Sequence, residues 1–292
     1  MSSILFRGFD KIPNRYLGFG DVIMYYMVCY FKAKKLGHDD VHVVFPSLNP
    51  SYVKMEKNAY YIQPSNFLPI TLHRRDEKFN NDDYDEVIDI SEKNSLFHGY
   101  KGMKFHFWET EKYLNKYYLD TNEPPYLNIE RTYKGKPYII MHYRNMKWPN
   151  VERNTSSGEF SKTLEILKDR FKDKYEYWKC GETSLIDSNF DKVLEPMWNN
   201  IDGFTSIVRN SSLVVSCSSG PPSYAWFFED IPIINISTHY STSYYNPKRW
   251  RSICGTEFGN IFPEWLDDRC LYLYKNKFNT ENLINFLERH KL

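Results

Sequence analysis

The sequence has almost no net charge and no long hydrophobic run. Its 38 basic and 37 acidic side chains give a formal net charge of +1, so no broad surface for nucleic acid is expected, although a local basic cluster could still bind phosphate. The longest apolar run, Val22 to Phe31, is shorter than the ~18–20 residues that cross a bilayer. It follows Asp21 and has no small-residue cleavage site, which favours a buried helix over a signal peptide. No transmembrane segment and no nucleic-acid partner are expected.

The cysteines are also few, and their spacing forms no recognisable motif. The five cysteines are odd in number and widely spaced, and no C-x-x-C pair occurs. A zinc ribbon and a disulfide framework are therefore both unsupported. The default is a reducing, cytoplasmic location, in which the N-x-S/T matches at Asn154, Asn210 and Asn235 carry little weight as glycosylation sites.

Aromatic residues, by contrast, are abundant. Seven Trp, 24 Tyr and 20 Phe make up 17% of the 292 residues. Such rings can fill a core or stack on flat ligands and sugars, and composition does not choose between these roles. Spacing assigns most of them to the core, whereas residues 91–130 carry rings with poor periodicity and no element that we can place. Candidates for stacking are Tyr100, Phe107, Trp108, Tyr113, Tyr224 and Trp250.

Short apolar strands alternate with helical stretches, which is typical of an α/β fold built from βαβ units. Strands are expected at 3–9, 41–45, 84–90, 138–143, 175–179, 213–216 and 231–236. Helices are expected at 22–35, 161–171, 204–208, 222–228 and 280–290. The prolines Pro124 and Pro125 lie in a linker, so we predict two Rossmann-like domains facing a cleft, 1–130 and 131–292. Packing of the last helix back on the first domain is left open.

The first candidate motif is Gly18-Phe19-Gly20-Asp21. A glycine turn after a strand lets the backbone approach a ligand, and a carboxylate there faces the crevice at the strand ends. The alternative is that Asp21 is simply the N-cap of the following helix. The motif is not a full G-x-G-x-x-G, so a dinucleotide fingerprint is weak.

The second candidate begins where a predicted strand ends, at His142. The loop that follows contains Arg144, Lys147 and Arg153, which supply positive charge that can hold a phosphate. A solvated basic loop paired with Glu152 and Glu159 explains the same residues equally well. His142 on its own is more often a structural histidine than a catalyst.

The third candidate is the turn Ser218-Ser219-Gly220 before Pro221. Small residues followed by proline in a first helical turn expose backbone N–H groups that can bind an anion, but a plain strand-to-helix turn fits as well. Cys217 is read as a buried structural thiol rather than a nucleophile. The D-x-D at Asp83-Tyr84-Asp85 is read as an acidic strand entry rather than a metal site, so no metal and no resident cofactor are predicted.

Four stretches in this order resemble the family 9 glycosyltransferases, the heptosyltransferase-like enzymes with a GT-B fold. They are Gly18 to Val22, Tyr84 to Asp89, Lys147-Trp148-Pro149, and Ser219-Gly220-Pro221 with Ala225 followed by residues 231–234. His142-Tyr143-Arg144 also resembles the H-x-R of GDP-fucose transferases, in which the arginine holds the donor diphosphate. The sequence departs from the family 9 pattern at Ser218, where the family has Asp, and at Ser223, where it has His.

The resemblance implies a metal-independent transfer of a sugar from a nucleoside-diphosphate sugar to a glycan or glycolipid acceptor. Asp21 would be the general base of an inverting reaction. The donor diphosphate would meet Arg144, Lys147, Arg153 and the 218–220 turn, and acceptor or loop contacts would come from Gly18, Gly20, His142, Tyr224 and Trp108. A lipid-linked acceptor would add peripheral attachment to a membrane. The alternatives are a GT-B nucleotide-sugar epimerase and a non-catalytic binding module.

Overall fold

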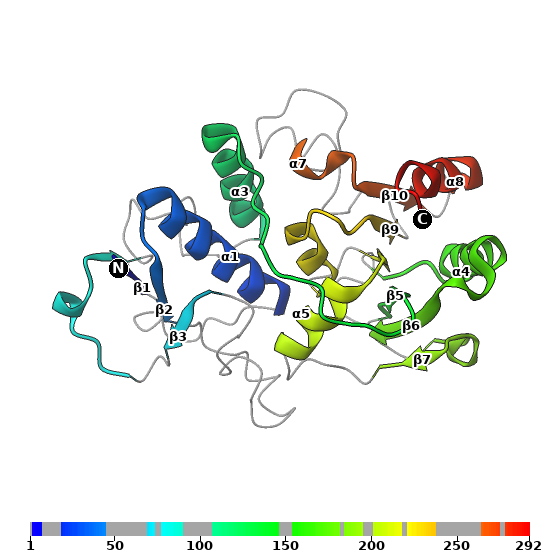
Figure 1. The fold of residues 1–292 in the computed structure, drawn as a ribbon, viewed down its shortest axis with the longest axis horizontal. Helices are drawn as coiled ribbons and strands as arrows, with labels where there is room; N and C mark the ends of the chain where they lie inside the picture. Colours follow the sequence, from blue (N-terminus) through cyan, green and yellow to red (C-terminus); the bar gives the residue numbers. More distant parts are fainter. Residues whose placement is uncertain are drawn as a thin grey trace. The chain divides into compact units, whose positions relative to one another are not determined.

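The computed structural model describes residues 2–7, 19–44, 69–73, 77–89, 107–145, 154–181, 184–194, 201–217, 221–237, 264–274 and 278–292. The chain forms two compact units (Figure 1). One comprises Met1–Pro125 with Trp198–Phe204, and the other comprises Tyr126–Met197 with Thr205–Leu292. From the sequence, this division was expected at residue 130.

The first unit is built on a parallel sheet. Its described strands are β1 (Ser3–Arg7), β2 (Asp40–Val44), β3 (Thr71–His73) and β4 (Glu86–Asp89), in the order β3-β2-β1-β4. Consecutive residues Ile4, Leu5 and Phe6 are all fully buried, as expected for a central strand of a parallel sheet that is covered on both faces. The 3-10 helix η2 (Asn81–Asp83) precedes β4.

Helix α1 (Phe19–Leu36) follows β1, and α3 (Phe107–Thr121) packs against it. The rings of Phe31 and Tyr117 lie 5.1 Å apart at this contact, and the ammonium of Lys35 lies 2.6 Å from the carboxylate of Asp120. Helix α1 ends at Gly37, whose φ of +84° lies in the left-handed region that favours glycine.

The start of α1 corrects one interpretation. The helix begins at Phe19, so Asp21 lies inside its first turn and is not the N-cap. The predicted start at Val22 was late because Gly20 has low helix propensity.

The second unit contains the described strands β5 (Tyr138–Tyr143), β6 (Glu176–Gly181), β7 (Lys192–Val193), β8 (Leu213–Ser216), β9 (Ile233–Ser237) and β10 (Cys270–Tyr274). All pair in parallel in the order β10-β9-β8-β5-β6-β7. The chain leaves the central strand β5 in one direction along the sheet and then returns to build the other half from β8. This is the doubly wound order of a Rossmann fold, with its switch point between β5 and β8.

The helical elements of this unit connect the strands. They are α4 (Ser157–Phe171), η4 (Lys172–Lys174), η5 (Asp187–Asn189), α5 (Ile201–Asn210), η6 (Pro221–Phe227), α7 (Glu264–Asp267) and α8 (Thr280–Arg289), where η marks a 3-10 helix and the first residues of α5 group with the first unit. The segment predicted as a helix at 222–228 is thus a 3-10 helix. None of the helices that the structure describes combines the length and hydropathy needed to span a bilayer.

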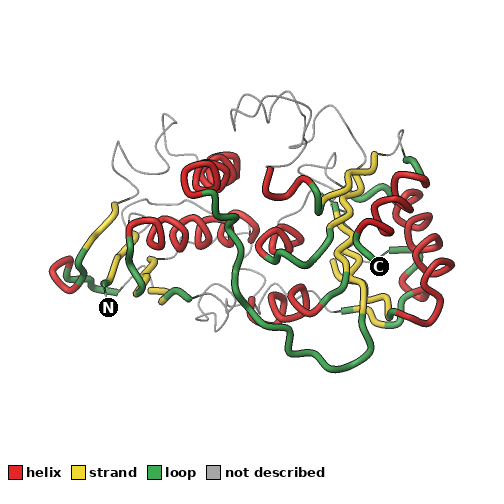
Figure 2. The backbone as a smooth tube through the Cα atoms, turned by 45° about the horizontal axis from the view of Figure 1, so that its top comes forward, coloured by secondary structure: helices red, strands yellow, loops and turns green. Residues whose placement is uncertain are grey.

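Helices α4 and α8 lie side by side near the sheet of the second unit (Figure 2). Leu283, Phe286 and Leu287 of α8 belong to the same buried cluster as Leu164 and Phe171 of α4. The apolar face of the last helix is therefore used within its own unit.

The predicted fold class, two Rossmann-like α/β domains, is confirmed. Helices α3 and α7 and strands β3, β7 and β10 were not predicted from the sequence. The strands β3 and β7 are two or three residues long and lie at sheet edges, where little burial marks them in the sequence. Helix α3 buries Leu114 and Tyr117 among charged and polar neighbours, which hides its period.

Candidate functional site

The carboxyl ends of β5 and β8 form the candidate site in the second unit. These two strands are neighbours at the switch point, and α/β folds bind ligands in the crevice outside such strand ends. His142 and Arg144 lie at the end of β5, and Ser216 and Cys217 lie at the end of β8. The structure therefore brings together two predicted site residues, His142 and Arg144, with the residue that precedes the Ser218-Ser219-Gly220 turn.

Arg144 is held at the base of the loop that follows β5. Its backbone N–H donates to the Thr155 Oγ1 at 2.9 Å, and the Thr155 N–H donates back to the Arg144 carbonyl oxygen at 2.9 Å. Its Nη1 donates to the Asn154 Oδ1 at 3.0 Å. The side chain is only 6% exposed. A guanidinium stays charged in proteins, so the structure fixes a positive charge at this strand end.

The same loop leads into α4. The Tyr143 hydroxyl hydrogen-bonds the Ser157 Oγ at 2.8 Å, and the Ser156 hydroxyl donates to the carboxylate of Glu159. These contacts place the start of α4 beside the end of β5. The positive end of the helix dipole adds to the charge of Arg144 at this edge.

His142 is a buried neutral imidazole. Burial, together with the nearby charges of Arg144 and Lys179, lowers its pKa to about 3, and burial is the largest of these causes. Its Nδ1 faces the Cys217 Sγ at 3.9 Å, and among the residues that the structure describes its Nε2 meets no hydrogen-bond partner. Cys217 itself is 1% exposed, which fits the interpretation of a structural thiol. A neutral ring can offer one N–H donor and one acceptor, but no charge.

Lys179 and Gly181, which were not selected from the sequence, also lie near the carboxyl end of β5. Lys179 is 1% exposed, and its ammonium pairs with the Asp187 Oδ1 at 2.8 Å. Burial alone would raise the pKa of Asp187, but hydrogen bonds from Lys179 and Ser184 lower it overall. Lys179 adds a second buried positive charge near His142.

Gly181, at the end of β6, has a φ of +92°. A Cβ there would lie 2.1 Å from the Tyr143 carbonyl oxygen and 3.2 Å from the His142 Nε2. Only glycine fits this position without a shift of the backbone. The available sequence signal was a glycine two residues after the predicted strand 175–179.

Most of the other predicted site residues either lie outside the described residues or are described by their backbone alone. Gly18, Lys147, Arg153, Ser218, Ser219, Gly220, Tyr100 and Trp250 lie outside the described residues. For Gly20, Asp21, Phe107 and Trp108, only the helical backbone is described. Tyr224 is fully buried, which corrects its nomination as a stacking ring, because no face of it is open to a ligand. Tyr113 lies on α3 and is partly buried, and burial raises its pKa.

In the Asp83-Tyr84-Asp85 motif, Asp85 forms hydrogen bonds within the sheet of the first unit. The Asp85 carboxylate accepts from the Ser3 backbone N–H at 2.7 Å and from the Ser3 hydroxyl at 3.3 Å, and the first of these bonds is the main cause of its lowered pKa. This geometry fits the predicted acidic strand entry. In the part of the chain that the structure describes, no three His, Cys, Asp or Glu residues are placed to hold a metal ion.

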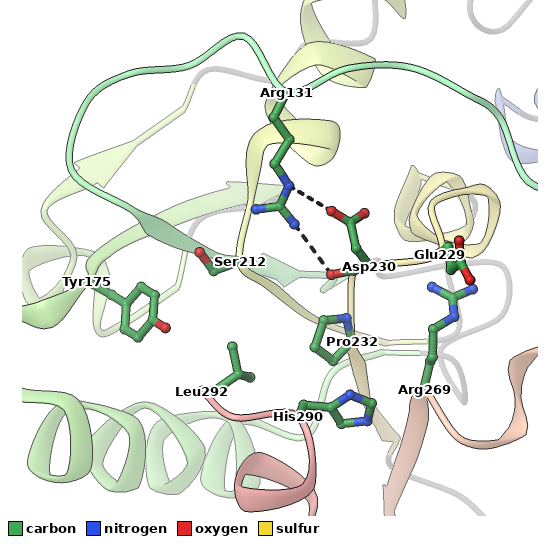
Figure 3. Close-up of a pocket in the computed structure, with 9 residues that line it drawn as sticks. All are labelled: Arg131, Tyr175, Ser212, Glu229, Asp230, Pro232, Arg269, His290 and Leu292. Carbon is green, nitrogen blue, oxygen red and sulfur yellow. Dashed lines mark hydrogen bonds and ion pairs between the residues drawn. The ribbon is translucent and has the colours of Figure 1, made fainter.

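The second unit also contains a cavity of about 260 Å³, shown in Figure 3. It is lined by Arg131, Tyr175, Ser212, Glu229, Asp230, Pro232, Arg269, His290 and Leu292. Tyr175, Ser212, Pro232 and Arg269 all directly precede strands, so the cavity lies at the amino edge of the sheet, opposite the candidate site. Its arginines are committed to structural contacts. Arg131 pairs with Asp230 at 2.9 Å, and Arg269 donates to the carbonyls of Trp226, Phe228 and Ile231.

No protein-family model and no curated protein sequence matches the chain. Solved structures do. The E. coli ADP-heptose LPS heptosyltransferase II matches over the full length of both chains, with a TM-score of 0.52 and 9% identity. The E. coli heptosyltransferase WaaC with ADP matches 99% of this chain and 100% of its own length, with a TM-score of 0.46 and 10% identity.

A third match is the iron-containing dodecameric glycosyltransferase TibC from enterotoxigenic E. coli H10407, at 14% identity and a TM-score of 0.46. It covers 84% of this chain but only 61% of that enzyme, so the chain spans about three fifths of the length of TibC. At these identities the likeness concerns the fold alone. The full-length match to heptosyltransferase II and the two doubly wound units together establish that the chain has the fold of GT-B glycosyltransferases.

Proposed function

We propose that this protein is a GT-B glycosyltransferase that moves a sugar from a nucleoside-diphosphate sugar to an acceptor hydroxyl. The observation that carries the proposal is the buried guanidinium of Arg144 at the switch point of the second sheet. A fixed cation at that edge is suited to a donor diphosphate. The fold and the four stretches that resemble family 9 enzymes support the same reading.

On the donor side, the proposal concerns how the protein stabilises the departing nucleoside diphosphate. As the sugar–phosphate bond breaks, negative charge develops on the nucleoside diphosphate. Arg144 and Lys147 are proposed to stabilise that charge directly, with Arg153 nearby. Backbone N–H groups of Ser218, Ser219 and Gly220 are proposed to bind the phosphate oxygens from the β8 side. Preorganised donors of this kind lower the barrier because they do not need to reorient during the reaction.

The acceptor half concerns Asp21. It lies in the first turn of α1, the helix that follows β1 in the chain. We propose that its carboxylate takes the proton of the acceptor hydroxyl as that oxygen attacks the anomeric carbon. A single displacement of this type inverts the anomeric configuration. Gly18 and Gly20 are proposed to let the acceptor approach the backbone, and Trp108 of α3 to stack on a sugar ring.

The donor and acceptor classes are narrower proposals. The name of the full-length structural match includes ADP-heptose and LPS, so ADP-linked heptose and a glycolipid are the first pair to assay. The serines at 218 and 223 stand where the resembled family has Asp and His, so hexosyl and GDP-fucosyl donors belong in the same panel. This acceptor class is consistent with a cytoplasmic protein that attaches peripherally to the membrane when it binds its glycolipid substrate.

The test is an assay of nucleoside-diphosphate release from ADP-, GDP- and UDP-sugars, with and without glycan acceptors. The proposal expects acceptor-dependent release from one donor class, and a loss of about 100-fold or more in kcat for Asp21→Asn. Asp39→Asn, an exposed substitution between α1 and β2, is the matched control and keeps wild-type turnover.

Each alternative has its own signature in this assay. A rearranged nucleotide sugar that forms without acceptor would replace the proposal with an epimerase. Tight nucleotide binding without turnover of any donor would replace it with a binding module. Full activity of a folded Asp21→Asn variant would remove Asp21 as the base.

A further inference from the structure

One row of polar side chains, here called the polar row, crosses the second sheet near its carboxyl edge. Because the strands pair in parallel, residues of neighbouring strands lie level with one another. The pairing of Met141 with Val215 joins the two halves of the row, since the next residues on these strands are His142 and Ser216. The row crosses four neighbouring strands and consists of His142 of β5, Ser216 of β8, Asn235 of β9 and Tyr272 of β10.

The polar row lies on one face of the sheet. Successive strand residues point to opposite faces, and Met141, Val215 and Ile234 belong to the buried apolar cluster that α4 and α8 share on the other face. The level residues one step earlier on the face of the row are apolar and buried: Ile140, Val214, Ile233 and Cys270. This face therefore changes from apolar to polar in a single step toward the carboxyl edge.

Two side chains of the polar row are buried with unpaired atoms. His142 is 2% exposed and Asn235 is 3% exposed. Among the residues that the structure describes, neither the His142 Nε2 nor the Asn235 Oδ1 meets a hydrogen-bond partner. Between them, the Ser216 hydroxyl donates to the carbonyl oxygen of the adjacent Cys217 at 3.0 Å. An unpaired buried polar atom destabilises a fold, so two of them in one row point to a group from outside the chain that completes their bonding.

The polar row carries no charge. The His142 imidazole is neutral, and the other members are a hydroxyl, an amide and a phenol. Arg144, by contrast, brings a fixed positive charge to the loop after β5. The two places suit different parts of one ligand: Arg144 suits a phosphate, and the polar row suits an uncharged group with hydrogen-bond donors and acceptors.

The position of Asn235 favours the base of a nucleotide over the transferred sugar. Asn235 lies two strands away from β5, in the order β9-β8-β5, which is roughly 10 Å at about 5 Å between neighbouring strands. In a nucleoside-diphosphate sugar, the transferred sugar is bonded directly to the diphosphate, whereas the ribose separates the base from it. The edge of a base also presents uncharged donors and acceptors that an amide can match.

We propose that the polar row is the floor of the nucleobase subsite and that Asn235 selects among bases. This inference rests on the proposed transferase function. The diphosphate binds where β5 and β8 end, at Arg144, and the base extends along the carboxyl edge toward β9. The base then supplies the hydrogen bond that the Asn235 Oδ1 lacks in the free protein.

Calorimetric titration of Asn235→Leu with ADP, GDP, UDP and inorganic pyrophosphate tests the subsite. Leucine has a similar volume and removes an unpaired polar atom, so the urea midpoint of the free protein is expected to stay the same or rise. Affinity for the nucleotide that the wild type binds best is expected to fall about tenfold, and the preference among the three bases is expected to shrink. Binding of pyrophosphate, which has no base, is expected to match the wild type.

Trp265→Phe is the matched control. It also removes a buried atom without a partner among the described residues, the indole Nε1. Trp265 lies on α7, which precedes β10 at the opposite edge of the sheet, so wild-type nucleotide affinities are expected.

Three results would overturn the inference. Wild-type affinity and base preference in Asn235→Leu would mean that water alone completes the row, and would leave the proposed function intact. A lower urea midpoint together with weaker pyrophosphate binding would give Asn235 a structural role instead. If the wild type binds none of the three nucleotides, the inference fails together with the proposed function.

Discussion

The Sγ atom of Cys217 lies 3.9 Å from the Nδ1 of His142, so the ends of β8 and β5 meet through a thiol and an imidazole. Both side chains are almost fully buried. The pair lies beneath the edge at which Arg144 and the 218–220 turn are proposed to bind a diphosphate. We infer that it supports this edge without supplying charge, because the imidazole is neutral at physiological pH.

This neutrality makes stability depend on pH. The folded-state pKa of His142 is about 3, below the unfolded value of about 6.5. Below about pH 6.5 the unfolded chain therefore binds a proton that the folded chain does not. The contribution of His142 to the free energy of unfolding should fall by about 1.4 kcal/mol per pH unit as the pH drops from 6.5 toward 3. Urea titrations at pH 7 and pH 5 measure it. His142→Gln should show a shallower fall, and equal falls in both proteins would contradict the assignment.

Substitution of Gly181 tests the tight packing at the end of β6. Gly181→Ala places a Cβ against the Tyr143 carbonyl oxygen at a positive φ, and should lower the free energy of unfolding by about 1–3 kcal/mol. Gly158→Ala is the matched control, because its Cβ meets nothing within 4 Å on α4. It should be neutral or raise the free energy of unfolding by up to about 1 kcal/mol. Thermal or urea unfolding compares the two, and a smaller loss for Gly181→Ala than for Gly158→Ala would contradict the packing argument.

The ion pair of Lys179 and Asp187 gives an asymmetric prediction. Asp187→Asn leaves a buried ammonium without its counter-charge and should destabilise the protein by about 3–5 kcal/mol. Lys179→Met removes that charge and leaves Asp187, whose side chain is 25% exposed, within reach of water. It should therefore cost less. The difference in urea midpoint between the variants measures this, and a larger cost for Lys179→Met would mean that the chain tolerates the buried charge better than its burial indicates.

Much of the second sheet was predictable from the sequence. Strand β5 has the bounds that were expected, because Pro137 precedes six consecutive buried residues of a central parallel strand. The basic residues after it marked a strand end, which located His142 and Arg144. By contrast, Gly181 and Lys179 depend on the pairing of β6 with β5, where Cys180 lies opposite His142. Such a register is a property of the folded sheet and has no local signal.

The contact between His42 and His73 in the first unit, whose Nδ1 and Nε2 atoms lie 2.8 Å apart, was hidden for the same reason. His42 and His73 are 31 residues apart, and β3 is a short edge strand without a clear pattern. Only the parallel pairing of β2 with β3 brings the two rings together. The start of α1 at Phe19 was missed for a local reason, because a glycine in the first turn masks the boundary.

The most direct test of the proposed donor site is calorimetric titration of the protein with ADP, GDP and UDP. The account predicts that at least one of these nucleotides binds and that Arg144→Gln weakens its binding about tenfold or more, because a buried charge-assisted contact is lost. Arg131→Gln, at the opposite edge of the same sheet, should bind as the wild type does. Unchanged affinity in a folded Arg144→Gln variant, or no binding of any of the three nucleotides, would contradict it.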